Sequence, residues 1–532
     1  MQSPEPSRLS PTVAAWLPSA AAALIGALSL TGRVQANDVL RDSLWAAAAL
    51  LVLWNLGLVL MARRSDPGGM PVVESSLRPQ HYIQAICQLA VFAYWGWYWR
   101  PVYDTAALIG AQLAFAYGFG MLLTWSRGGR YRLGFGPFPI IFSINLFLWF
   151  RDDWFYLQFL MIAVGFVGKE LIQWRREGRR VHVFNPSALA LGLFSLVLIA
   201  TGATELTWGQ EIASTLSLAP RIYLFLFLVG LVVMYFFSIT LIAAFAAAVL
   251  FGLSAAYSAW AGVPYFVDSE IPAAVFLGLH LLVTDPSTSP RTPLGKAMFG
   301  ALYGFGVFAL YAVLGAAGAP TFYDKLLCVP LLNLSVRAID HLVRQLDARG
   351  FVVPGVGGEA ALLPRARWWS PARLNLAHIA VWVAFFGLMA GTGRTDARHA
   401  GDSVPFWELA CLDGRRNACD QLVRIEASYC ADNSAWACNE LGIHHSEGRV
   451  VQADSDLSRG YFSRACELRF QAACINLLEG TSTVRARPRA LDLRLLLREG
   501  GLNLMEMSEP ELLRRACDHS WSFACERTAS PS

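Results

Sequence analysis

The sequence predicts an all-α protein in two parts: a polytopic bundle of about thirteen membrane helices and a disulfide-bridged domain of α-helical hairpin repeats. Three observations support this prediction. Of the 532 residues, 55% are hydrophobic and 15% are charged, whereas soluble proteins carry about 25% charged residues. Apolar segments close to the roughly 20 residues that a spanning helix needs recur from residue 12 to residue 392. The remaining residues are regularly charged and rich in cysteine.

Each apolar segment is expected to be one helix that crosses the membrane. The fifth and tenth are the shortest, and the thirteen lie near residues 12–32, 43–62, 82–99, 105–125, 137–151, 154–174, 183–202, 221–237, 239–260, 271–284, 297–316, 322–343 and 374–392. We expect the first to be retained, because residues 2–11 lack the basic region of a signal peptide beyond Arg8. The predicted domains are an N-terminal tail (1–11), a transmembrane domain (12–392), a linker (393–402) and a repeat domain (403–527).

Arginine and lysine predict the orientation, since loops rich in these residues stay in the cytoplasm. The loops after the second, fourth and sixth spans are rich in arginine, whereas the alternate loops are poorer in basic residues or balance them with aspartate. The N-terminal tail is therefore expected in the cytoplasm and the repeat domain outside, with membrane lipid around the bundle. The net charge of +4 is small and scattered, which argues against a nucleic-acid partner.

Eight cysteines of the predicted repeat domain form four pairs of one spacing, Cys-x7-Cys. On a continuous helix this spacing separates two Cα atoms by about 12 Å, and a disulfide tolerates about 7 Å at most. A bridge within a pair therefore needs a break, which Asp413-Gly414 and Asp432-Asn433 would allow. Zinc ligands and free core cysteines are the alternatives, and an extracytoplasmic location favours disulfides. The pairs are Cys411/Cys419, Cys430/Cys438, Cys466/Cys474 and Cys517/Cys525.

The middle cysteine pairs repeat after 36 residues, from Cys430 to Cys466 and from Cys438 to Cys474. This period is typical of helical hairpins of the tetratricopeptide class. Residues 403–480, with the segments WACNELGIHHSEG and YFSRACELRFQAACINLLEG, resemble the cysteine-rich Sel-one-like repeats of secreted bacterial proteins. The resemblance implies one disulfide within each pair. Because helical-hairpin arrays usually bind proteins on a concave face, we also expect a protein partner for this domain.

Two proline motifs lie at helix ends on the same predicted face. Residues 280–304, HLLVTDPSTSPRTPLGKAMFGALYG, join the tenth and eleventh spans through a turn that begins at Asp285. Asn185-Pro186 opens the seventh span, where Asn can also serve only as a helix cap. Two helices of opposite direction, each with a proline motif at one face, suit an inverted repeat, and transport folds often place sites at such repeat interfaces.

These motifs resemble those of the NqrB/RnfD family, the membrane subunits of the sodium-pumping NADH:quinone oxidoreductase and of the Rnf electron transport complex. The resemblance covers roughly residues 80–345 and is carried by the TDP and NP elements. Family members carry FMN as a phosphoester on the last threonine of an (S/T)-G-A-T sequence. The resemblance therefore implies FMN as cofactor, attached to Thr204 of Thr201-Gly202-Ala203-Thr204, with Asn185 and Asp285 as further cofactor-binding candidates. The family usually has an aspartate before this motif, and this chain has Leu198 and Ile199 there.

A Thr-Gly-Ala-Thr segment is also an ordinary helix stop, in which Gly takes the left-handed conformation. With the flavin, the resemblance implies a subunit of an electron-transport complex in a bacterial inner membrane, where flavin-mediated electron transfer accompanies ion translocation. No NADH-binding motif is present, so the other subunits of a redox complex are implied as partners. The alternative is a membrane-anchored scaffold that recruits partners through its extracytoplasmic repeats.

Polar residues inside spans are costly and are often functional. His280, one turn before Asp285, and Asp340 are the candidates for an ion path. Asp340 is also placed to pair with Arg337 on the same helix face. A haem ligand is the other role considered for His280, His341 or His378, although such histidines more often form helix contacts. We predict no catalytic residue and no metal site.

Overall fold

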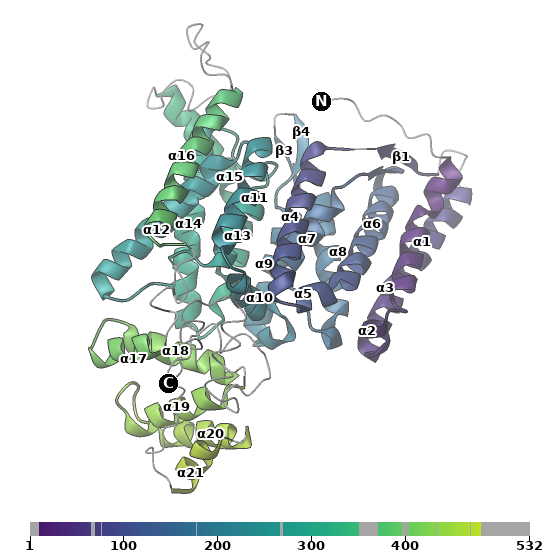
Figure 1. Cartoon of the computed structure of the whole chain (residues 1–532). Coiled ribbons are helices and arrows are strands. Elements are labelled where there is room, and N and C mark those ends of the chain that lie inside the picture. Colours follow the sequence, from purple (N-terminus) through teal and green to yellow (C-terminus); the bar gives the residue numbers. More distant parts are fainter. Residues whose placement is uncertain are drawn as a thin grey trace.

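The computed structural model describes residues 10–64, 70–75, 77–176, 178–266, 270–349, 371–395, 401, 404–431, 433–468 and 470–479. Figure 1 shows a layer of roughly parallel helices, with the helices of residues 404–479 gathered at one end of that layer. The predicted all-helical architecture is confirmed for these residues, apart from two small sheets. Cys517 and Cys525 lie outside the described residues.

Within the residues that the structure describes, seven helices are long and apolar enough to cross a membrane. The first and last of them are flanked by charged or polar residues, and each shows an apolar surface to its surroundings as well as a buried face. They are α1 (Pro11–Leu28), α3 (Asp38–Arg64), α6 (Ala106–Gly128), α12 (Thr240–Ala261), α14 (Pro293–Ala316), α15 (Asp324–Ala348) and α16 (Pro371–Gly391).

The other six expected spans also coincide with helices, but these do not meet the same criteria of length and composition, so the number thirteen is not confirmed. Four of them are α4 (Pro79–Tyr98), α8 (Tyr156–Leu171), α9 (Pro186–Thr201) and α11 (Ile222–Phe237). The last two are α7 (Pro137–Asn145) and α13 (Ala273–Leu281), with nine residues each. Nine residues of α-helix extend about 14 Å, roughly half of a hydrocarbon core.

The bundle contains two five-helix units with matching internal contacts. The first unit is α4, α6, α7, α8 and α9, and the second is α11, α12, α13, α14 and α15. In both units the first helix packs on the short third helix, the second on the fourth, and the fourth on the fifth. Across the units, α4 packs on α11 and α9 on α15. This is the contact pattern expected of a repeat related by a pseudo-two-fold axis.

The two ends of the bundle differ in charge. One end, here called the basic face, carries both two-stranded sheets and the arginine-rich connections (Figure 1). Strand β1 (Val72–Ser75) pairs in parallel with β2 (Arg130–Leu133), and β3 (Gln173–Arg176) pairs in antiparallel with β4 (Arg179–His182). The opposite end, here called the tail face, carries the short helices α2 (Gly32–Gln35), α5 (Pro101–Asp104) and α10 (Gly209–Thr215) and the C-terminal helices.

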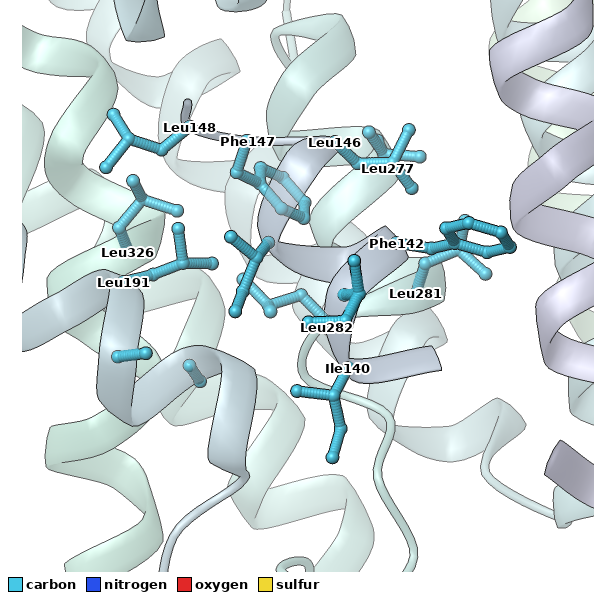
Figure 2. Packing of buried hydrophobic residues seen from close by; sticks show 14 of the residues in the cluster. Ile140, Phe142, Leu146, Phe147, Leu148, Leu191, Leu277, Leu281, Leu282 and Leu326 are labelled. Atoms are coloured by element: carbon cyan, nitrogen blue, oxygen red, sulfur yellow. The ribbon is translucent and has the colours of Figure 1, made fainter. Parts of the chain in front are cut away.

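The short helices begin at opposite faces, since α7 follows β2 of the basic face and α13 follows the segment after α12 at the tail face. Figure 2 shows where they meet: Phe142 and Phe147, on α7 and just after it, lie beside Leu277 and Leu281 of α13. Leucines of α9 and α15 complete this apolar cluster. The chain thus closes the space between the units with packed hydrocarbon, which is stable without water.

The described residues between 404 and 479 form consecutive helices joined by disulfides. Cys411–Cys419, Cys430–Cys438 and Cys466–Cys474 each connect two consecutive helices with Cα atoms 4.6 to 4.7 Å apart. The predicted breaks are confirmed, since Gly414 and Asn433 adopt left-handed backbone angles between the helices. The helices are α17 (Val404–Leu412), α18 (Ala418–Ala431), α19 (Ala435–Glu447), α20 (Ser455–Glu467) and α21 (Gln471–Glu479).

A loop closed by the first disulfide contacts the tail face of the bundle. Arg415 donates a hydrogen bond to the Gly262 carbonyl oxygen (3.3 Å), and the Asn417 side chain donates to the Tyr257 hydroxyl (3.1 Å). The Arg416 guanidinium lies over the Trp260 ring, 4.7 Å from its centroid. The helical domain therefore contacts the end of α12 through polar and aromatic groups and through Ala261 and Val263, which share its core.

Candidate functional site

Thr204, the predicted flavin-attachment residue, begins the 3-10 turn η3 (Thr204–Leu206) directly after α9 at the tail face. Helix α9 ends because Gly202 adopts a left-handed conformation (φ 66°) and its N–H bonds back to Ile199 and Leu198 carbonyl oxygens. The expected helix stop is thus confirmed. It turns the chain sharply, so that Thr204 lies past the helix end with a partly exposed side chain.

The three threonines of this segment differ in what their hydroxyls bond. The Thr201 hydroxyl donates to the Val197 carbonyl oxygen at 2.8 Å. The buried Thr207 hydroxyl donates to the Thr204 carbonyl oxygen at 3.1 Å. The Thr204 hydroxyl has no hydrogen bond to any residue that the structure describes. Of the three oxygens, the one on Thr204 is therefore the one available for chemistry.

The backbone around Thr204 is held by a second segment, residues 149–151, which follows α7. The Arg151 N–H donates to the Leu206 carbonyl oxygen, and the Trp208 N–H donates to the Trp149 carbonyl oxygen, both at 2.9 Å. The Arg151 guanidinium adds a bond to the Glu205 carbonyl oxygen (2.7 Å) and an ion pair with Glu211 (2.6 Å). We call residues 149–151 and 204–208 together the outer bracket; its bonds fix the position of Thr204.

Tryptophans gather against the outer bracket. Trp95 of α4 and Trp99, directly after it, stack on each other (5.1 Å between ring centroids), and Trp99 stacks on Trp149 (5.8 Å). Trp208 meets Trp99 edge-on at 6.1 Å, and its ring carries the Arg151 guanidinium 4.5 Å from the centroid. Trp95, Trp99 and Trp149 are buried, and Trp208 is partly exposed. We call these four residues the tryptophan cluster.

At the opposite, basic face the structure brings the two proline motifs together. Asn185 caps α9 by accepting hydrogen bonds from the Ser187 and Ala188 N–H groups. Its side-chain amide also donates to the Leu282 carbonyl oxygen (3.0 Å), and its backbone N–H donates to Asn333 of α15 (3.0 Å). Capping is therefore one of three tasks of Asn185, which joins α9, α13 and α15.

Asp285 lies next to this junction. Its carboxylate is 3.5 Å from Nε2 of His182, on β4, and accepts a hydrogen bond from the Ser287 N–H at 2.9 Å. Burial raises the pKa of Asp285, but the hydrogen bond and charge of His182 and the bonds from Ser287 lower it more, so the net pKa lies below the usual value. Asp285 is thus held as a carboxylate at the basic face.

The two ion-path candidates lie apart and in different settings. His280 is fully buried on α13; its Nδ1 is 2.7 Å from the Phe276 carbonyl oxygen, and its Nε2 has no hydrogen-bond partner among the described residues. Asp340, on α15, pairs with Arg176 of β3 at 2.8 Å. The considered pairing of Asp340 with Arg337 does not occur, because Arg337 lies over the Trp174 ring and donates to the Arg175 carbonyl oxygen.

Sequence reasoning missed the outer bracket, the tryptophan cluster and Gln158. Gln158 donates to Gln112 (3.0 Å), and Gln112 exchanges hydrogen bonds with Asn145 at the end of the short helix α7. These amides satisfy polar groups where α7 ends inside the bundle, which hydrocarbon requires. Gln112 and Asn145 were both recognisable as polar residues in spans, and the tryptophans carried a weaker signal, since aromatic residues at span ends are common.

The fold and these sites define a class: a helical protein whose described part contains seven helices able to cross a membrane and a disulfide-bridged helical tail. The chain matches no family model, and it has no significant match among curated proteins or solved structures.

Proposed function

We propose that this protein is a flavin-carrying subunit of a bacterial electron-transport complex, lies in the inner membrane and holds FMN on Thr204. The motif resemblance supplies the cofactor, and one structural observation supports the site. Thr204 alone, among the three threonines of its segment, has a hydroxyl free of hydrogen bonds to described residues, on a partly exposed and firmly held turn. A phosphoester requires such a hydroxyl, because the oxygen must reach a phosphorus atom outside the fold.

The outer bracket suits this attachment. Forming the ester makes one bond between phosphorus and the Thr204 oxygen, breaks one bond from phosphorus to the leaving group of an activated flavin nucleotide, and releases the hydroxyl proton. Arg151, whose side chain is 40% exposed, places positive charge beside the turn and favours a negatively charged phosphodiester. When bound, the flavin supplies one- and two-electron transfer, and partner subunits supply its donor and acceptor.

In this proposal, electron transfer is coupled to ion movement at the contact between the two five-helix units. The cluster in Figure 2 closes that contact with hydrocarbon, so an ion crosses only if the units shift against each other. His280 lies one residue before the end of α13, and Asn185 joins that end to the start of α9, so a shift between the units would act on both residues. Asp340, ion-paired with Arg176, contributes by holding β3 to α15.

Fluorescence of the denatured protein tests the flavin. The chain would be expressed together with a flavin transferase, denatured, separated by electrophoresis and illuminated without staining. We expect a fluorescent band for the natural sequence and for Thr201→Val, whose hydroxyl bonds within α9, and no band for Thr204→Val. A dark natural band would overturn flavin attachment and favour the membrane-anchored scaffold. Equal bands for all three proteins would show that the flavin is attached to a residue other than Thr204.

The proposed orientation places the basic face in the cytoplasm and the disulfide-bridged domain outside. After mild reduction of intact spheroplasts, a membrane-impermeant thiol reagent should label cysteines of that domain, such as Cys419 and Cys466, before the spheroplasts are lysed. The buried Cys87 and Cys328 should stay unlabelled and serve as internal controls. Labelling that occurs only after lysis would contradict this orientation and place the disulfide-bridged domain in the cytoplasm.

A further inference from the structure

The tryptophan cluster presents one partly exposed ring beside the proposed attachment point. Trp95, Trp99 and Trp149 are 0%, 7% and 2% exposed, so their stacked rings offer no open face. Trp208 is the partly exposed member, and it belongs to the same outer bracket as Thr204. Trp208 is therefore the member of the cluster whose ring is accessible to a group tied to Thr204 from outside.

The Trp208 ring is held firmly enough to act as a surface. Its edge rests on Trp99, its backbone N–H is bonded to Trp149, and one of its faces carries the Arg151 guanidinium. Arg151 is itself fixed by the Glu205 carbonyl oxygen and by Glu211. A side chain so constrained loses little further freedom when a ligand docks, which is the general basis of pre-organised binding.

We propose that Trp208, with Arg151, forms the docking surface for the isoalloxazine ring of the flavin on Thr204; this inference rests on the proposed function. The electron-rich indole suits the electron-poor flavin ring, as offset or edge-on aromatic contacts do in general. The Arg151 guanidinium, which is also ion-paired with Glu211, can donate hydrogen bonds to phosphodiester oxygens and stack on planar groups. The Thr204 ester, the Arg151 charge and the Trp208 ring then act on one ligand.

Trp154 differs from Trp208 in the contacts of its ring. Trp154 also lies at the tail face and is 39% exposed. Its ring contacts Tyr156 at 6.0 Å. Its backbone N–H donates to the Arg151 carbonyl oxygen, but its ring makes no aromatic contact with the outer bracket among the described residues. Trp154 is thus a more exposed tryptophan on the same face whose ring does not contact the outer bracket, and it provides a control for exposure alone.

The test compares flavin emission from the folded and the denatured protein. An indole in contact with an excited flavin transfers an electron to it and recovers that electron at once, so emission falls without net oxidation. In the natural protein we expect weak emission when folded and full emission when denatured. Trp208→Phe, which keeps an aromatic ring for packing but is a far poorer electron donor than indole, should raise the folded-state emission clearly above that of the natural protein.

Each outcome separates this inference from the proposal beneath it. Equal denatured-band intensity in Trp208→Phe and the natural protein shows that attachment is intact, and raised folded emission then supports the docking surface. Equal denatured bands with unchanged folded emission would overturn the docking surface and leave flavin attachment standing. Equal rises in Trp208→Phe and Trp154→Phe would also overturn it. A dark band in the natural protein would overturn both.

Discussion

Asn185 and Leu282 are 97 positions apart in the sequence, yet the Asn185 side-chain amide donates a hydrogen bond to the Leu282 carbonyl oxygen at 3.0 Å. This bond caps the end of the short helix α13, where the backbone leaves the helix inside the bundle. Carbonyl groups at a helix end need such a partner, since hydrocarbon offers none. One side chain thereby begins α9 and completes α13.

Replacing Asn185 should weaken the whole bundle. Asn185→Ala removes the cap of α9 and leaves the Leu282 carbonyl oxygen without its donor, a loss of about 1–3 kcal/mol. We expect a lower midpoint of thermal unfolding for the detergent-solubilised protein. Size-exclusion chromatography after heating to successive temperatures measures that midpoint. Gln345→Ala, which removes an exposed amide from α15, is the control and should leave the midpoint unchanged. Equal midpoints for both variants would show that the junction contributes no net stability.

A second prediction concerns Gly300, where α14 crosses α12 closely. A Cβ atom added at Gly300 would lie 2.2 Å from the Ile242 carbonyl oxygen, a backbone atom that cannot turn aside. Gly300→Ala should therefore separate the helices and cost roughly 1–3 kcal/mol, the usual penalty of overpacking. Gly252→Ala, on α12 with nothing within 4 Å, should be neutral or slightly stabilising. Thermal midpoints of the two variants measure the difference, and similar midpoints would contradict the close crossing.

The first disulfide should control the loop that contacts the bundle. Removing the Cys411–Cys419 bridge frees a short loop and costs about 2–3 kcal/mol in the chain-entropy model. With Arg415 and Arg416 in that loop, the double Cys→Ser variant should be cut faster there by trypsin. The corresponding variant of Cys466 and Cys474 should leave cleavage at Arg415 and Arg416 slow, because that bridge joins α20 to α21. Fragment mapping by mass spectrometry distinguishes the two results.

The ion pairs of Glu74 with Arg130 and Arg132 predict that the stability of the fold depends on pH. The hydrogen bond from Arg132 lowers the pKa of Glu74, burial opposes this, and Arg130 lowers the pKa further. A depressed carboxyl pKa stabilises the fold above the unfolded-state value of about 4.3, and this contribution disappears as pH falls through the folded-state value. Glu74→Gln should lower stability by about 0.5–1 kcal/mol near pH 7. The difference between Glu74→Gln and the natural protein should shrink as pH falls below the unfolded-state value of about 4.3 and vanish below the folded-state pKa of Glu74, as thermal midpoints across pH would show.

Much of the secondary structure could be predicted from the sequence, because it depends on neighbouring residues. Hydropathy located a helix in every expected span, and the proline at the first position of α9 and the glycine after its last residue marked its ends. The Cys-x7-Cys spacing likewise indicated that each pair must join two helices, as the three described bridges do. What hydropathy did not distinguish is a full span from a half span, since α7 and α13 are as apolar as their longer neighbours.

The candidate site was predictable only in part. The Thr-Gly-Ala-Thr segment and the two proline motifs are visible as motifs, but the hydroxyl that stays free, the bond from Asn185 to Leu282 and the pairing of Asp340 with Arg176 are not. Each of these depends on side chains more than 90 positions apart or on competing local bonds. From the sequence, Trp208 resembles any tryptophan at a membrane interface. Only the structure shows that Trp99, Trp149 and Arg151 surround it.

The sequence by itself determined that this protein is helical, rich in segments fit for a membrane, and stapled by cysteine pairs near its C-terminal end, because hydropathy, helix signals and spacing act over a few residues. The tertiary structure decided which helices stop halfway, how two five-helix units meet, and which residues surround Thr204. Packing makes those choices, since each polar group inside the bundle must find a partner wherever the fold brings one within reach.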